Sequence, residues 1–233
     1  MKLNNKSAPL KNPLCVALDV DDISVALKLA EDLADTVGGF KIGPRLVFKY
    51  GAQIIKQLSH KLPVFVDCKF FDIPSTMEAS VKAAADAGAS LITIHALSGI
   101  KAMKALSKIQ SQYQDLKILP VTVLTSWTDS DLQNNFKFQT TSDLVKSLCS
   151  DIQNAGLNSV VCSALELEIA KSFGFYSVTP GIRFDLQETS DQSRTMTPME
   201  AIKKGSNVLV VGRPIIEAPS PREAAIDFMT AIY

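Results

Sequence analysis

A regular alternation of short apolar runs with helical segments most constrains the fold of this chain. The runs span residues 14–19, 39–43, 64–67, 91–95, 118–125, 159–163, 176–181 and 208–212. Most are continuously apolar instead of alternating between apolar and polar residues. Such runs are typical of strands that are covered on both faces, as in a parallel sheet.

Helical patterns lie between these runs. They cover residues 21–34, 76–87, 142–155 and 198–204, and the first places its apolar side chains on one face. Aspartates open that segment, and Gly38 and Gly39 follow it as stop signals.

Eight strand–helix units in 233 residues predict an α/β fold of the (β/α)8 class, a single-domain TIM barrel. Residues 13–233 would form the catalytic barrel, and residues 1–12 a tail or a cap over the barrel floor. An open doubly wound sheet is the alternative. It is less favoured because no G-x-G-x-x-G motif follows the first strand.

Composition narrows the possible partners. Lysine plus arginine equals aspartate plus glutamate at 24 each, so no overall field attracts nucleic acid or an anionic membrane. Any anion site must be local. No run of about 18 apolar residues occurs, and the N-terminus lacks the apolar core of a signal peptide. We therefore expect no transmembrane helix and a cytoplasmic location.

The cysteines and histidines argue against a metal site. Cys15, Cys68, Cys149 and Cys162 are scattered without a C-x-x-C pair, and there are only two histidines. Cys15 and Cys162 fall within apolar runs, where cysteine usually packs as a small core residue. We expect neither disulfides nor zinc.

Polar residues gather where the predicted strands end, the edge of such a barrel that carries chemistry. They are Asp19, Lys41, Asp67, Lys69, His95, Thr125, Arg183, Gly212 and Arg213. A single aspartate there often caps a helix, and a single lysine is often only solvated. Alternating Asp and Lys on one rim can pair each charge and keep the lysines protonated. A protonated lysine in a dry site is a general acid.

The end of the eighth strand predicts a phosphate site. Gly212 would allow close approach of the backbone, and the planar fork of Arg213 suits a phosphate. The alternatives are a glycine needed only for a turn and an arginine paired with a surface acid. The long polar stretch between Gly181 and Pro198 lies nearby in the chain and could close over a ligand. His95 is expected to orient a neighbour.

Together these residues resemble the bacterial orotidine 5′-phosphate decarboxylases from Leu14 to the C-terminus. The motifs are A-L-D at 17–19, K-I-G at 41–43, D-C-K-F-F-D-I-P-S-T at 67–76, V-T-V-L-T-S at 121–126, V-V-C-S-A at 160–164, V-T-P-G-I-R at 178–183, D-Q-S-R at 191–194 and V-G-R-P at 211–214. The D-x-K-x-x-D element, with Asp and Lys on the first two strands, is specific in combination.

The resemblance implies decarboxylation of orotidine 5′-monophosphate to uridine 5′-monophosphate without a cofactor or metal, in pyrimidine biosynthesis. Lys69 would protonate C6 of the pyrimidine, and Asp67 would lie against the substrate carboxylate. Lys41 and Asp19 would bind ribose hydroxyls and complete the charged array.

The same resemblance implies a homodimer with shared sites and further substrate contacts. Asp72 and Thr76 would reach the partner's site, and Ile73 would border the space that carbon dioxide leaves. The remaining implied contacts are Thr125 to the pyrimidine, Gln192 between base and phosphate, Arg213 and the Gly212 amide to the phosphate, and Arg183 to the ligand.

The central motif departs from the family pattern K-F-H-D-I-P-N-T at two positions, where Phe71 and Ser75 replace His and Asn. Neither position is assigned to the proton transfer, so packing or loop geometry is affected and the reaction class is not.

Three other functions stay open. The first is a 3-keto-L-gulonate 6-phosphate decarboxylase, which shares the barrel and motif but uses magnesium. The second is a phosphate-binding barrel isomerase with an acid/base pair on opposing strands, and the third is a module that binds orotidylate without turning it over.

Overall fold

The computed structural model describes residues 9–113, 115–135, 140–184 and 195–233. Within them, eight parallel strands close into a barrel in the order of the sequence, β1 to β8. The strands are β1 (Leu14–Ala17), β2 (Gly39–Ile42), β3 (Val64–Phe70), β4 (Ala89–His95), β5 (Lys117–Val121), β6 (Ser159–Val161), β7 (Tyr176–Thr179) and β8 (Val208–Val211). The predicted TIM barrel and all eight predicted strands are confirmed.

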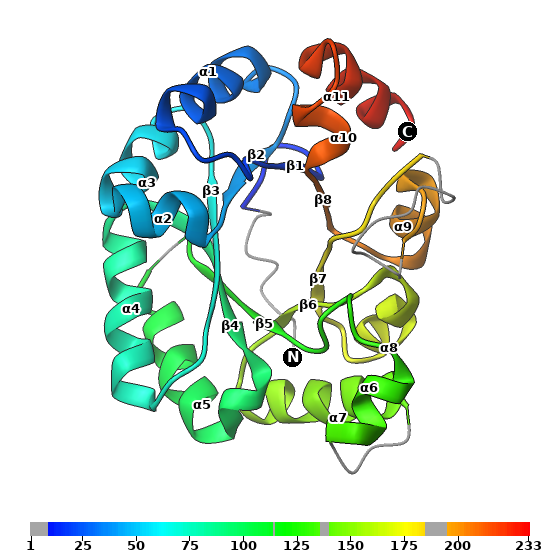
Figure 1. Cartoon of the computed structure of the whole chain (residues 1–233). Coiled ribbons are helices and arrows are strands. Elements are labelled where there is room, and N and C mark those ends of the chain that lie inside the picture. The colour runs from blue at the N-terminus through cyan, green and yellow to red at the C-terminus, as the bar shows by residue number, and fades with distance from the viewer. Residues whose placement is uncertain (1–8, 114, 136–139, 185–194) are drawn as a thin grey trace.

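Helices surround this ring of strands (Figure 1). They are α1 (Ile23–Leu33), α2 (Pro44–Tyr50), α3 (Ala52–Ser59), α4 (Pro74–Asp86), α5 (Gly99–Gln110), α6 (Asp129–Asn135), α7 (Thr141–Asn154), α8 (Leu167–Ser172), α9 (Pro198–Lys204), α10 (Arg213–Ile216) and α11 (Pro221–Thr230), with short 3-10 turns η1 (Ala96–Ser98) and η2 (Ala164–Glu166). The four predicted helices correspond to α1, α4, α7 and α9.

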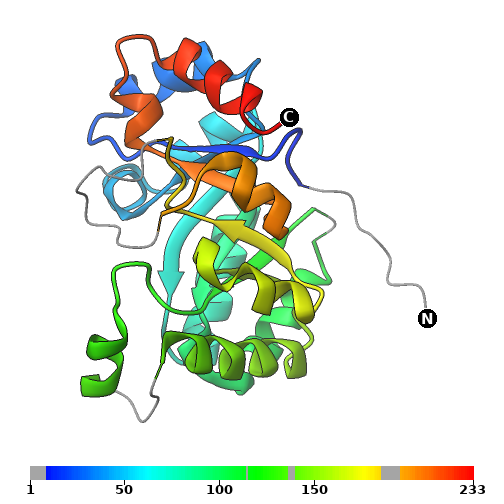
Figure 2. The same ribbon diagram turned by 90° about the vertical axis from the view of Figure 1, so that its right-hand side faces the viewer.

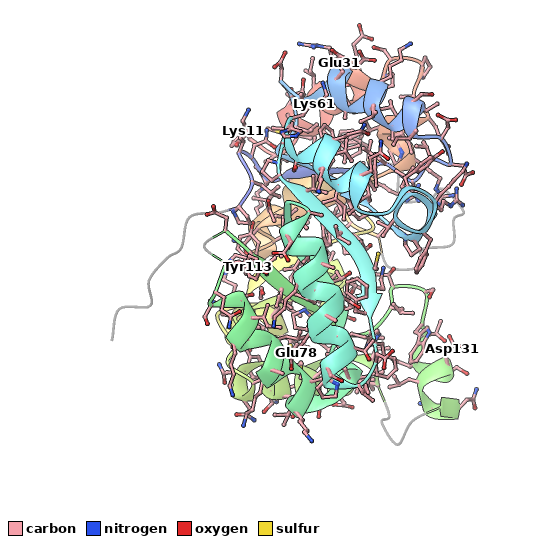
Figure 3. All side chains as sticks on the ribbon, turned by 90° about the vertical axis from the view of Figure 1, so that its left-hand side faces the viewer. Lys11, Glu31, Lys61, Glu78, Tyr113 and Asp131 are labelled. Carbon is pink, nitrogen blue, oxygen red and sulfur yellow. The ribbon has the colours of Figure 1, made fainter. Side chains whose placement is uncertain are left out.

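Burial on both faces explains the continuous apolar runs. In β1, Leu14 and Val16 pack among the helices, whereas Cys15 and Ala17 belong to a second apolar cluster inside the barrel. Side chains on the outer helices, such as Glu31 on α1 and Glu78 on α4, stand on the outside of the barrel (Figure 3). Strand β1 therefore contributes to two cores at once, and β3, β4, β5, β6 and β8 do the same.

The first described residues lie at the end of the barrel where the strands begin, opposite to the direction in which β7 points (Figure 2). Leu10 is buried in the interior cluster. A Cβ atom at Gly38 would lie 2.0 Å from the Asn12 carbonyl oxygen, and one at Gly39 would lie 2.8 Å from the Pro63 carbonyl oxygen. At these two positions only glycine leaves room for the backbone of Asn12 and Pro63, which lies against them. Gly38 and Gly39 do not terminate helix α1, because that helix ends earlier, at Leu33.

The observed strand bounds differ from the predicted ones by a few residues, and they differ most at the ends of β3 and β5. β3 continues to Phe70, which pairs with Ile94 after a register shift. β5 ends at Val121 and not at residue 125. Only Thr122 still donates its amide to the Val161 carbonyl, at 3.2 Å, because the chain leaves the sheet here.

Candidate active site

The alternation of side chains along the strands positions the charged residues. Ala17 and Phe65 belong to the apolar cluster inside the barrel. Asp19 lies two residues after Ala17, and Asp67 lies two residues after Phe65. Because side chains along a strand alternate between its two faces, both aspartates point to the same inner side. Lys41 lies on β2 between them, paired in register with Ala17 and Phe65. The predicted charges therefore meet at one rim.

Three ion pairs join these residues. The Lys41 Nζ lies 3.0 Å from Asp19 Oδ1 and 3.5 Å from Asp67 Oδ2. The Lys69 Nζ lies 2.8 Å from Asp67 Oδ1. Asp67 thus has one lysine on each carboxylate oxygen, and the expected Asp-Lys-Asp-Lys array is present.

Burial and charge act in opposite directions on this network. Burial acts to raise the pKa of Asp67, but the charges of Lys41 and Lys69, with the Thr93 hydroxyl, outweigh it and hold the pKa below its usual value. Burial likewise acts to lower the pKa of Lys41, yet Asp67 and Asp19 leave that pKa raised. Both groups are therefore charged at neutral pH.

Thr93 is a site residue that the sequence analysis missed. It lies on β4, is fully buried, and donates its hydroxyl to Asp67 Oδ1 at 2.9 Å. The available signal was its place two residues after Leu91, which faces the barrel interior. A polar residue on that inner face, at the same level as Asp67, points toward the same rim.

His95 ends β4, as predicted. Its Nδ1 accepts a hydrogen bond from the Leu97 amide at 3.3 Å, and its ring lies 5.9 Å from the Phe71 ring. Burial, with the nearby Lys69 charge, lowers the pKa of His95, so the ring is neutral at physiological pH.

A cavity of about 250 Å³ opens beside the charged network. Asp19, Lys41, Asp67 and Lys69 line one part of it. Apolar residues line another part: Val121, Val123, Leu124, Val161, Val178 and Val210. The predicted Thr125, Arg183, Gly212 and Arg213 also border this cavity. An apolar cavity with a few converging polar groups is the usual form of a small-molecule site.

The predicted phosphate corner follows β7 and β8. Arg183 is buried, and Arg213 begins α10 with Gly212 before it. A Cβ atom at Gly212 would lie 3.5 Å from the Ala17 Cβ and 3.8 Å from Asp19 Oδ2, which are ordinary contact distances. Packing within the chain therefore does not require glycine at this position.

Backbone hydrogen bonds connect the two ends of the chain that joins β7 to α9. The Arg183 amide donates to the Met196 carbonyl at 3.1 Å, and the Met196 amide donates to the Gly181 carbonyl at 3.2 Å. Gln192 lies outside the described residues.

Asp72, Ile73 and Thr76 lie apart from the cavity lining, at the start of α4. All three are exposed, and the Ile73 side chain is 64% exposed. Asp72 Oδ1 accepts a hydrogen bond from the Ile73 amide at 2.6 Å. The structure therefore does not bring these three residues into the cavity of their own chain.

The four cysteines are free thiols. Burial raises the pKa of Cys15 to about 12 and that of Cys68 to about 11. Across the described ranges, no three His, Cys, Asp or Glu side chains form a group that could hold a metal ion. Nor does that part of the chain contain a helix with the length and apolar character needed to span a membrane.

Fold and site together define a class: a (β/α)8-barrel enzyme with a lysine–carboxylate centre on β1 to β3 and arginines after β7 and β8. The family model of the orotidine 5′-phosphate decarboxylase / HUMPS family matches residues 12–228. The chain belongs to this family, and the resemblance inferred from its motifs is confirmed.

Individual relatives agree with the family match. The chain is 40% identical over 237 residues to an orotidine 5′-phosphate decarboxylase of Shewanella sediminis, covering 99% of this chain and 97% of that one. A solved orotidine 5′-phosphate decarboxylase from Lactobacillus acidophilus superposes with a TM-score of 0.82 at 32% identity, covering 95% of this chain and 99% of that one. A Methanocaldococcus jannaschii orotidine 5′-monophosphate decarboxylase, solved with the inhibitor BMP, gives 0.77 at 25% identity, covering 95% and 98%.

Proposed function

We propose that the chain decarboxylates orotidine 5′-monophosphate to uridine 5′-monophosphate in pyrimidine biosynthesis, without a cofactor, and that Lys69 supplies the proton. The observation that carries this proposal is the Lys69 Nζ, 2.8 Å from the partly buried Asp67 carboxylate at the wall of the cavity. The family match and the full-length relatives support the reaction.

The chemistry explains why an ammonium is needed there. When the bond from C6 to the carboxylate breaks, its electron pair stays on C6, in an orbital that the ring delocalises poorly. A fixed ammonium offsets this charge and then transfers a proton to C6, forming the C6–H bond. Carbon dioxide leaves, and the neutral lysine regains a proton from water.

The other charged residues hold the substrate in place. Asp67 lies against the substrate carboxylate, while Lys41 and Asp19 bind ribose hydroxyls and keep Lys69 and Asp67 aligned. Thr125 contacts the pyrimidine. Since phosphate lies far from the bond that breaks, its binding energy can be used to close the site and stabilise the transition state.

Gly212, Arg213, Arg183 and Gln192 complete the substrate contacts in this proposal. Arg213 and the Gly212 amide bind the phosphate, Arg183 contacts the ligand, and Gln192 bridges base and phosphate. Support comes from the position of Gly212 and Arg213 at the cavity wall, and from packing that does not itself require the glycine.

We further propose a homodimer in which the start of α4 enters the partner's site. Asp72 and Thr76 would contribute there, and Ile73 would border the space left by carbon dioxide. Phe71 and Ile73, which are 63% and 64% exposed, flank Asp72 and give this segment the apolar surface that an interface requires.

The proposal extends to the domain organisation and the cellular location of the protein. Residues 13–233 would form the catalytic barrel, and the protein would act in the cytoplasm. Of the expected tail or floor cap at residues 1–12, residues 1–8 lie outside the described part of the chain. Neither nucleic acid nor a membrane is a partner, in keeping with the balanced charge of the chain.

The direct test is the loss of orotidylate absorbance on addition of purified protein. Turnover with release of carbon dioxide and formation of uridine 5′-monophosphate supports the proposal. Binding of the product without any turnover of orotidylate would instead indicate a binding module.

Removal of divalent metal ions with EDTA distinguishes the proposed reaction from the magnesium-dependent decarboxylase. Here Asp19 and Asp67 are each paired with lysine, which favours a metal-independent centre. Activity on orotidylate should survive EDTA treatment followed by desalting. Loss with EDTA and recovery with magnesium would overturn the cofactor-free mechanism.

Mixing inactive subunits tests the shared site. Lys69→Ala and Asp72→Ala proteins should each be inactive alone. If Asp72 acts across the interface, a mixed dimer contains one site with both wild-type residues, and activity partly returns. Absence of recovery, despite subunit exchange shown by differently tagged chains, argues against Asp72 crossing the interface.

A further inference from the structure

Strand β3 carries an irregularity at its catalytic end. Val66 pairs with Ile92 and Phe70 pairs with Ile94, so Asp67, Cys68 and Lys69 all lie opposite the single residue Thr93. Such a bulge removes regular ladder hydrogen bonds and redirects side chains. Asp67 and Lys69 therefore owe their placement to contacts other than the sheet ladder.

The backbone of Lys69 is also in an unusual conformation. Its φ of 47° makes it the single non-glycine residue with positive φ in the described part of the chain. L-residues adopt this left-handed region rarely, because the Cβ atom approaches the backbone. Such a conformation persists only where surrounding contacts hold it.

Thr93 supplies those contacts through one hydroxyl. The Lys69 amide donates to Thr93 Oγ1 at 2.9 Å, in place of a carbonyl of the ladder. The same hydroxyl donates to Asp67 Oδ1 at 2.9 Å, the oxygen that also accepts from Lys69 Nζ at 2.8 Å. Its distance to the Val66 carbonyl oxygen is longer, at 3.5 Å. A single buried group thus fixes the lysine backbone and the lysine's carboxylate partner.

We propose that Thr93 is a positioning residue for the decarboxylation: its hydroxyl holds the left-handed Lys69 backbone and Asp67 Oδ1 in one geometry, and so aims the Lys69 ammonium into the cavity. This inference rests on the proposed proton-donor role of Lys69. Thr93 itself does not touch the substrate in this scheme.

The opposing interpretation is that the hydroxyl only satisfies buried polar groups, as other buried hydroxyls do. Thr179 on β7 offers a matched control. It is equally buried, and its Oγ1 lies 2.7 Å from the Ser206 Oγ, away from the charged network. Thr→Val at either position removes a buried hydroxyl at nearly constant volume.

The first experiment compares Thr93→Val, Thr93→Ser and Thr179→Val in the full chain. Loss of hydrogen bonds to charged groups should lower the kcat of Thr93→Val about 10- to 100-fold, whereas the Kd for uridine 5′-monophosphate should change less than about threefold. Thr93→Ser should keep kcat within about fivefold, since it retains the hydroxyl. Thr179→Val should leave kcat near wild type even if its Tm falls.

Several outcomes would overturn the inference. These are an unchanged kcat in Thr93→Val, a kcat in Thr93→Ser as low as in Thr93→Val, or equal kcat losses in Thr93→Val and Thr179→Val. Should Thr93→Val not fold, Thr93→Cys keeps a weak donor and acceptor in a similar volume. It should show an intermediate loss of kcat, and an unchanged value there would contradict the proposal.

A crystal structure of Thr93→Val without substrate gives a measurement independent of turnover. Lys69 should leave its left-handed conformation, or its Nζ should move away from the 2.8 Å contact with Asp67 Oδ1. An unmoved pair overturns the positioning role. If the wild-type chain failed to decarboxylate orotidylate, the proposed function would fall, but this structural result would still decide the role of Thr93.

Discussion

The two halves of the barrel rim are built differently. On β1 to β4, charged side chains contact one another at 2.8 to 3.5 Å and with Thr93 form a connected network. On β5 to β8, the cavity wall is mainly apolar, with arginines at its outer corner. The charged side chains are held by one another and by Thr93, and such fixed charges are what electrostatic preorganisation requires. The apolar half gives shape and excludes water.

Lys69→Ala is the substitution with the largest expected effect on the difference between the charged and apolar halves of the rim. If Lys69 is the proton donor, as proposed, its removal also takes away the positive charge next to C6, so kcat should fall by at least about 10⁴-fold. Turnover is measured by orotidylate absorbance and folding by circular dichroism. Lys61→Ala, at an exposed position after α3, serves as the control and should keep full activity. Near-normal turnover by Lys69→Ala would remove the residue from proton transfer.

Arg213→Ala tests the other half of the rim. If Arg213 binds the phosphate, as proposed, loss of this charge-assisted contact should lower kcat/KM about 100-fold. The same variant should bind uridine 5′-monophosphate more weakly and uridine, which lacks phosphate, as wild type does. Arg222→Ala on α11, an exposed arginine that contacts the Asp32 carbonyl, is the matched control. An unchanged kcat/KM for Arg213→Ala would exclude it from the phosphate site.

The charged half also predicts a pH dependence of stability. Burial acts to raise the pKa of Asp67, but Lys41 and Lys69 hold it below its usual value. Asp67 therefore contributes stability above its unfolded pKa of about 3.9, and this contribution is lost as the pH falls through the folded pKa.

Urea unfolding of wild type and Asp67→Asn measures this effect. The wild type should have the larger free energy of unfolding near about pH 7, and the difference should shrink below about pH 4. Glu78→Gln on the outside of α4 should change stability little. A wild-type advantage that stays constant down to about pH 3 would contradict the ion pairing of Asp67.

The smallest effect is expected at Phe71, which lies next to the network without joining it. Its ring is 63% exposed and contacts the His95 ring. Phe71→His restores the residue of the family pattern and keeps an aromatic ring next to His95, so kcat should change less than about threefold. A large change in kcat would place this position inside the functional network.

The parts of the fold predicted from the sequence were those set by local pattern. Continuous apolar runs indicated strands covered on both faces, and strand-end polar residues indicated the rim that carries Asp19, Lys41 and Asp67. The bulge in β3 could not be predicted, since it depends on pairing with β4, a neighbour distant in sequence. The spacing of two from Leu91 places Thr93 on the inner face, but its contacts with Asp67 and with the Lys69 amide depend on the same pairing and could not be predicted.

The placement of the α4 start illustrates another limit. The family resemblance assigns Asp72 and Thr76 to a partner's site, yet within one chain they are exposed residues beside a helix N-terminus. A sequence pattern cannot distinguish an exposed side chain that serves a second subunit from one that serves none, because both face outward.

The pairing of Ile182 with Met196 has a consequence for the diversification of this barrel. Gly181 and Arg183 pair with Met196 through two backbone hydrogen bonds, where the connection from β7 to α9 begins and ends. The two ends of that connection are therefore held to each other as well as to β7 and α9. Sequence differences within the connection therefore need not alter β7 or the ion pairs among Lys41, Asp67 and Lys69.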